Sequence, residues 1–166
     1  MMLPPHLRAL IRLKRARVDF LLIGAMAMNN YVPEVAGAYS TSDCDILLRP
    51  TLSNLRRALR ELSRAGYALR VNDEPLLGLD SLILRRLLEF RSAVRAEKDG
   101  GLPLDLLVDA KGFRFEEWWR RRADFKAGNA RIPCAARNER SGKNKPACIE
   151  WSWFAASPGA RPPRAL

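Results

Sequence analysis

Hydrophobic residues along the chain fall into short strand-like runs, separated by segments in which they recur at helical spacing. Val18 and the run 20–23 (FLLI) predict a buried strand that ends at Gly24. A short helix over 25–31 follows, and a second strand over 43–48 (DCDILL) comes after a loop. Strands that alternate with helices in this way indicate an α/β (α+β) fold.

The rest of the chain continues the same alternation. Leucines at 52, 55, 59 and 62 recur at spacings of three and four and predict a helix on the sheet, which Gly66 ends. Apolar stretches over 87–94 and 102–108 predict a hairpin, because an Asp-Gly-Gly turn lies between them. The other predicted elements are helices over 5–15 and 115–122, a strand over 67–71, a loop or short helical turn over 72–82, and a hairpin tip at 127–130.

Two carboxylates stand at the start of the predicted strand over 43–48. Asp43 and Asp45 are two residues apart, so in a strand they point to the same face, with Cα atoms roughly 6.5 Å apart. Cys44 then points to the opposite face, where we expect a small buried side chain. Asp-x-Asp is also found at helix N-caps and solvated loop ends, so the pair alone does not define a metal site.

A third carboxylate lies inside the apolar segment 104–108 (LDLLV). An aspartate in a half-buried strand is costly unless it is paired or bound to a metal, or unless an edge strand turns it to water. The predicted hairpin would place Asp105 in a strand next to Asp43 and Asp45. Asp109, four residues further on, is a rival for the same role. Carboxylates are the ligands that Mg²⁺ prefers, together with substrate phosphates.

Taken together, these residues resemble the nucleotidyltransferase superfamily, which has a polymerase-beta-like palm. The closest likeness is to the small bacterial abortive-infection toxin, or minimal nucleotidyltransferase, type. It covers about residues 18–135 and rests on an ordered series: a hydrophobic strand, Gly24, a helix, Asp43-x-Asp45 on a strand, and Asp105 between aliphatic residues. The resemblance implies a mixed, twisted sheet flanked by helices on one side.

The resemblance also implies a reaction and its residues. In the family two Mg²⁺ ions assist the transfer of a nucleoside monophosphate from an NTP such as ATP to a hydroxyl on RNA, a protein or a small molecule. The implied catalytic and metal-binding residues are Asp43, Asp45 and Asp105, and the implied nucleotide contacts are Gly24, Ala25 and Ser42. The family usually has Ser or Gly where this chain has Ala25, so a hydroxyl contact to phosphate is lost and backbone N–H contacts remain.

The chain changes character near residue 135. We expect a nucleotidyltransferase-like domain over 1–135 and an irregular or divergent tail over 136–166, which has four prolines and no helical periodicity. The family would continue with a lysine-containing helix. We hypothesise that the tail is a frameshifted or divergent version of that helix.

Charge and cysteine content indicate which binding partners and which cellular compartment suit the chain. The net charge of +11 and the pI near 10.4 favour polyanions. Residues 1–110 hold 16 Lys and Arg against 13 Asp and Glu, whereas residues 111–166 hold 13 against 5. The arginines of the helix over 52–64 are interpreted chiefly as a solvated face. Three cysteines without a disulfide or metal spacing favour a cytoplasmic protein, and no run approaches the ~20 apolar residues that span a bilayer.

Two classes of function remain open. The first is an Mg²⁺-dependent nucleotidyltransferase, possibly in a toxin–antitoxin or phage-defence system with a cognate partner protein. The alternative is a catalytically impaired module of the same fold that binds nucleotide, RNA or a partner protein.

Overall fold

The computed structural model describes residues 3–31, 41–110 and 114–135, so the predicted tail over 136–166 lies outside the described residues. The helices are α1 (Pro5–Arg15), α2 (Gly24–Tyr31), α3 (Leu52–Arg64), α4 (Ser81–Glu89) and α5 (Phe115–Arg120). The strands are β1 (Phe20–Leu22), β2 (Cys44–Leu48), β3 (Ala68–Val71), β4 (Glu74–Pro75), β5 (Val94–Glu97), β6 (Leu104–Leu107), β7 (Ala123–Ala127) and β8 (Ala130–Cys134).

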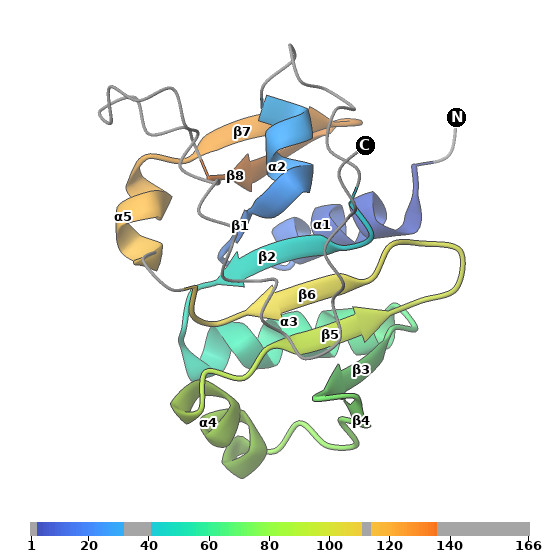
Figure 1. Cartoon of the computed structure of the whole chain (residues 1–166), viewed down its shortest axis with the longest axis vertical. Helices are drawn as coiled ribbons and strands as arrows, with labels where there is room; N and C mark the ends of the chain where they lie inside the picture. Colours follow the sequence, from blue (N-terminus) through green and yellow to red (C-terminus); the bar gives the residue numbers. More distant parts are fainter. Residues whose placement is uncertain (1–2, 32–40, 111–113, 136–166) are drawn as a thin grey trace, which may run out of the picture.

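All the described strands join one sheet in the order β4-β3-β5-β6-β2-β1-β8-β7 (Figure 1). The pairs β2–β6 and β1–β8 are parallel and the others are antiparallel, so the sheet is mixed. This confirms the α/β (α+β) class. β2 and β6 are neighbours in space although more than fifty residues separate them in the chain, and β1 lies on the other side of β2.

The two faces of the sheet differ in what covers them. On the first face, α1, α3 and α4 pack their apolar sides against the sheet and form the larger core, to which Leu10, Leu59 and Leu84 belong. On the second face a smaller cluster joins Leu21 and Leu47 to α5. The prediction of helices on one side is therefore right for three helices and wrong for α5, because Phe115 packs on the second face.

The main helix of the first face, α3, forms as its sequence predicts. The Thr51 hydroxyl caps its start by accepting a hydrogen bond from the Asn54 N–H at 3.3 Å. The leucines at 55, 59 and 62 are fully buried in the core. Gly66 follows the end of the helix with φ +80°, a conformation that glycine adopts without strain.

Two predicted segments between α3 and β6 are wrong. The stretch over 87–94 is not a strand: α4 runs from Ser81 to Glu89 and β5 begins only at Val94. The carboxylate of Asp80 caps the start of α4 by accepting hydrogen bonds from the backbone N–H groups of Leu82 and Ile83, at 2.9 and 3.0 Å. The loop over 72–82 likewise contains β4.

A tight turn joins β3 to β4. Asn72 and Asp73 both have positive φ, 50° and 65°, as a two-residue primed hairpin turn requires. β3 and β4 pair on either side of it, Val71 opposite Glu74. Asparagine and aspartate tolerate this conformation better than other non-glycine residues, so Asn-Asp is a turn signal.

Trp118 and Trp119 are partly buried against the second-face cluster. Cys44 is fully buried in the first-face core, as expected. Within the part of the chain that the structure describes, every helix is too short or too polar to span a bilayer.

Candidate functional site

The carboxylates of the predicted site meet in the middle of the sheet, on its second face. Asp45 in β2 is the direct register partner of Asp105 in β6. Both side chains point away from α1 and α3, because their neighbours Cys44, Ile46 and Leu106 fill the first-face core. The parallel pairing of β6 with β2 thus places the third carboxylate in a strand next to the first two, as the sequence predicts.

Asp43 stands just before β2, and its own loop holds it. The Thr41 hydroxyl lies 3.1 Å from Asp43 Oδ1 and 2.8 Å from the Asp43 carbonyl oxygen. The exposed Ser42 hydroxyl donates a long hydrogen bond of 3.5 Å to Asp43 Oδ2. Ser42 therefore contacts a predicted metal ligand, and its predicted contact to the nucleotide stays a prediction.

Burial and neighbouring charges raise the pKa values of Asp45 and Asp105. Asp45 is only 9% exposed, and burial, followed by the charges of Asp43 and Asp105, raises its pKa from 3.8 to about 7. Burial also raises the pKa of Asp105; the Arg95 guanidinium opposes that rise, and Asp43 and Glu97 add to it. Neighbouring like charges in a poorly solvated place favour a bound cation.

Gly24 lies beside this acidic group. Gly24 is the first residue of α2, and its φ of +79° allows the chain to turn sharply from β1 into the helix. The N–H of Ile23, the residue before it, donates a hydrogen bond of 3.0 Å to the Asp45 carbonyl oxygen. The start of α2, with Gly24 and half-buried Ala25, therefore adjoins the strand that carries Asp45.

Asp109, the rival for the third carboxylate, lies apart from this group. It follows β6 and forms an ion pair of 3.0 Å with Arg91. It is not among the charges that raise the pKa of Asp45, whereas Asp105 is. The structure therefore favours Asp105 as the third carboxylate and makes Asp109 a matched control.

Sequence reasoning missed the cations of this face. Arg95 in β5 faces Asp105 across the β5–β6 pair and donates hydrogen bonds of 3.3 and 3.1 Å to both of its carboxylate oxygens. Arg95 also pairs with Glu97 at 3.2 Å, and Glu97 pairs with Arg70 of β3 at 3.3 Å. A row of alternating charges thus runs across the second face from β3 to β6. The alternation Val94-Arg95-Ala96-Glu97 carries this signal, but only once β5 is placed correctly.

The donor set fits a hard divalent cation in its chemistry but not yet in its spacing. Three carboxylates, of which Asp45 and Asp105 have raised pKa values, suit Mg²⁺. Within residues 3–31, 41–110 and 114–135, however, no three acidic, His or Cys side chains converge closely enough to hold an ion. Arg95 already supplies the positive charge at Asp105, so loading the site with a metal requires Arg95 to release that carboxylate.

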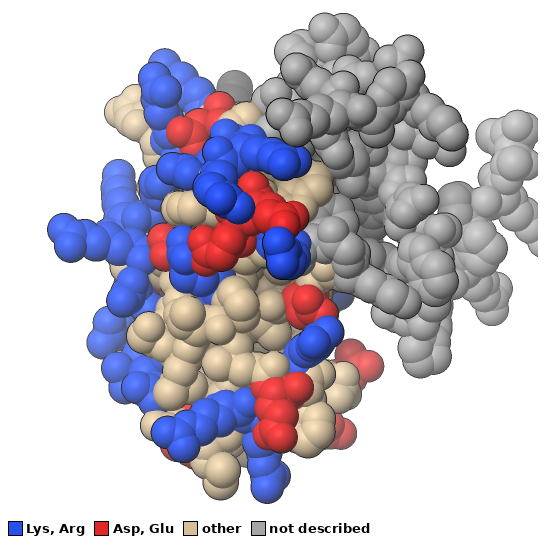
Figure 2. All heavy atoms as spheres, turned by 90° about the vertical axis from the view of Figure 1, so that its left-hand side faces the viewer, with Lys and Arg blue, Asp and Glu red and all other residues tan. Residues whose placement is uncertain are grey.

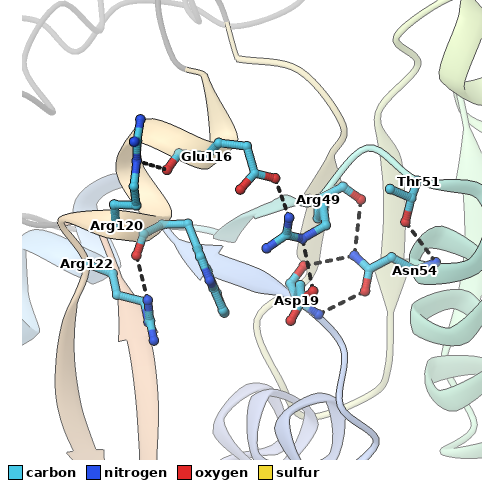
Figure 3. A network of polar contacts seen from close by, with 8 residues as sticks. Asp19, Arg49, Thr51, Asn54, Glu116, Arg120 and Arg122 are labelled. Carbon is cyan, nitrogen blue, oxygen red and sulfur yellow. Dashed lines mark hydrogen bonds and ion pairs between the residues drawn. The ribbon is translucent and has the colours of Figure 1, made fainter.

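A polar cluster around Arg49 braces the strands that carry the site (Figure 3). Arg49 follows β2 and pairs with Asp19, which precedes β1, at 2.9 Å, and also with Glu116 of α5. Its guanidinium lies 5.0 Å from the centre of the Phe115 ring. The buried amide of Asn54 accepts a hydrogen bond from the Asp19 N–H and donates to the carbonyl oxygens of Asp19 and Arg49. This cluster ties β1 and β2 to α3 and α5.

Comparison with known proteins leaves the chain without an assigned relative. No protein-family model, no curated protein and no solved structure matches it. The described part of the chain defines a mixed α/β domain with a carboxylate cluster on the second face of its sheet. The nucleotidyltransferase palm remains a prediction from the sequence.

Proposed function

We propose that the protein is a divalent-cation-dependent nucleotidyltransferase, which moves a nucleoside monophosphate from an NTP to an acceptor hydroxyl. The observation that carries this proposal is the register pairing of Asp45 with Asp105, with Asp43 near enough to raise the pKa of Asp45. Gly24 at the start of α2, beside the same strand, supports it further.

The proposed reaction forms a bond between the acceptor oxygen and the α-phosphorus and breaks the bond from that phosphorus to pyrophosphate, while the acceptor hydroxyl loses its proton. When bound, Mg²⁺ supplies positive charge to the triphosphate and lowers the pKa of the acceptor hydroxyl. Asp43, Asp45 and Asp105 would hold two such ions.

The chain's other residues bind and orient. Backbone N–H groups in the first turn of a helix lack intrahelical partners, so those of Gly24 and Ala25 at the start of α2 favour an anion such as a phosphate. The Thr41 hydroxyl fixes the carboxylate of Asp43 in its loop. Arg95 favours the ionised form of Asp105, because its guanidinium opposes the rise in the pKa of that carboxyl.

The test is transfer of label from α-labelled NTPs to RNA, protein or small-molecule acceptors in the presence of Mg²⁺. We expect Asp43→Ala and Asp45→Asn each to abolish transfer. Asp109→Asn is the matched control and should keep it, because Asp109 pairs with Arg91 outside the cluster. Transfer that survives Asp45→Asn would overturn the proposal, as would transfer that Asp109→Asn removes equally.

The ion pair between Arg95 and Asp105 favours a second candidate, a catalytically impaired module that binds nucleotide or RNA. In such a module an internal guanidinium takes the place of a metal at the third carboxylate. Calorimetric titration with Mn²⁺ separates the two: binding that Asp45→Asn removes supports the enzyme, and nucleotide binding without any divalent cation supports the module.

A further inference from the structure

The outward surface of α1 and α3 is strongly basic. The two helices together carry eight Lys and Arg residues and one acid, Glu61. The basic residues are Arg8, Arg12, Lys14 and Arg15 of α1 and Arg56, Arg57, Arg60 and Arg64 of α3. Figure 2 shows Lys and Arg side chains gathered along the left-hand edge of that view, where this helical layer lies behind the sheet of Figure 1.

Packing of the helices on the sheet separates their charged sides from their apolar sides. Leu10 and Leu13 of α1 and Leu59 of α3 are fully buried in the first-face core. The side of each helix that remains outside is therefore polar. Arg56, Arg57, Arg60 and Arg64 line a shallow hollow on α3, together with Ser53 and Glu61.

Contacts within the surface leave most of its charge uncompensated. Glu61 alone pairs with both Arg12 and Arg64, at 2.9 and 3.0 Å. Arg57 donates to a backbone carbonyl oxygen at 2.6 Å, which neutralises no charge. Arg15 and Arg60 are exposed and form no ion pair with another described residue. One carboxylate thus faces eight cations.

We propose that this α1–α3 basic surface binds the phosphodiester backbone of a nucleic acid. Arginine dominates it, and the planar guanidinium matches phosphate oxygens in pairs, which a point-like ammonium does not. Phosphate contacts of this kind are independent of base sequence and release counterions, so binding weakens steeply with salt.

An anionic membrane fits the same surface less well. A helix that lies in a membrane interface exposes an apolar face to the acyl chains. α1 and α3 have already used their apolar sides against the sheet. The surface also lies on the face opposite Asp45 and Asp105, so nucleic-acid binding there does not depend on the proposed catalysis.

The test is fluorescence anisotropy of labelled RNA and DNA duplexes of mixed sequence, titrated with the full chain at a series of NaCl concentrations. We expect the logarithm of the affinity to fall linearly with the logarithm of the salt concentration, by about 0.9 for each phosphate contact on duplex DNA. The double variant Arg15→Glu/Arg60→Glu should bind at least ~10-fold more weakly, with a slope shallower by about 2. Neither side chain has a described ion pair to lose, so far-ultraviolet circular dichroism should be unchanged.

The matched control is Arg121→Glu/Lys126→Glu, which makes the same change in net charge. Arg121 follows α5, and Lys126 lies on β7; both are exposed on the other side of the sheet. We expect this variant to bind nearly as tightly as the original chain. Equal losses in the two double variants would overturn the proposal. So would binding of phosphatidylserine vesicles, or of an acidic protein, by a chain that binds neither duplex.

Discussion

The two faces of the sheet differ in composition: the first carries the main apolar core, and the second carries the carboxylate cluster. The five-residue strand β2 contributes side chains to both faces. Cys44, Ile46 and Leu48 turn to the first face and are fully buried under α1 and α3. Asp45 turns to the second face, where it meets Asp105, Asp43 and the end of the Arg95 row. Because successive strand residues point to opposite faces, one short strand can be core on one side and site on the other.

The charges follow the same division. Carboxylates collect on the second face of the sheet, whereas the helices that cover the first face present arginines to solvent. Along residues 1–110 these charges nearly cancel, 16 basic against 13 acidic. A balance taken along the chain therefore hides an arginine-rich helical surface, which the topology of the sheet separates from the carboxylate cluster.

The largest effect that sharpens this comparison is expected at Ile46. The Ile46→Ala substitution removes a fully buried side chain from the first-face core and should lower the free energy of unfolding by about 2–5 kcal/mol. Urea denaturation at pH 8 measures it. The matched exposed control on the same sheet is Lys126→Ala, which should change stability by less than about 0.5 kcal/mol. If Ile46→Ala lowers the free energy of unfolding by no more than Lys126→Ala does, Ile46 is not part of a tightly packed core on the first face.

The next largest effect is expected at Asp45, the residue before Ile46, where a substitution should raise the free energy of unfolding. The raised pKa of Asp45, about 7 against 3.8, means that the folded protein holds a proton more tightly than the unfolded chain does. The stability that this protonation contributes is present below pH 4 and is lost as the pH rises to about 7. Asp45→Asn carries no such charge, so in metal-free buffer at pH 8 we expect it to be more stable than the original chain.

Urea denaturation across this pH range, in the presence of a chelator, measures the effect. The advantage of Asp45→Asn should shrink towards pH 4, where the original carboxyl is itself neutral. Added Mg²⁺ should stabilise the original chain at pH 8 and leave the variant unchanged, because an ion favours the charged carboxylates. A pH profile identical in the two proteins would show that Asp45 is not the titrating group.

Local patterns in the sequence sufficed for β1, β2, α3 and the β5–β6 turn, because each has a clear period and a glycine or threonine at its end. The prediction that Asp105 lies in a strand beside Asp45 is also confirmed, but the contact that brings them together is the long-range parallel pairing of β2 with β6. The local patterns failed over 72–94, where short apolar stretches between charged residues are compatible with either strand or helix. The capping by Asp80 and the Asn72-Asp73 turn were the overlooked local signals.

Long-range partners were beyond the reach of those patterns. Nothing local in the sequence indicates that Arg49 joins Asp19 to Glu116, because the three residues lie 30 and 67 positions apart. The role of Arg95 was likewise not predicted, because the predicted strand over 87–94 ends just before Arg95, whereas β5 runs from Val94 to Glu97. The sequence thus predicted the acids of the site, which follow from strand alternation, and not the cations, which follow from neighbours across the sheet.

The smallest effect on stability, and a sharp one on binding, is expected at Arg95. Arg95→Met keeps much of the side chain's length and removes the guanidinium from Asp105. The pair is partly exposed, so its loss should cost no more than about 1 kcal/mol of stability. The three carboxylates then have less positive charge near them, and calorimetric titration should show tighter Mn²⁺ binding at pH 8. Arg70→Met, which removes the cation at the far end of the row and leaves Asp105 paired with Arg95, should leave Mn²⁺ affinity nearly unchanged. Weaker Mn²⁺ binding by Arg95→Met would mean that the guanidinium supports the site and does not compete for it.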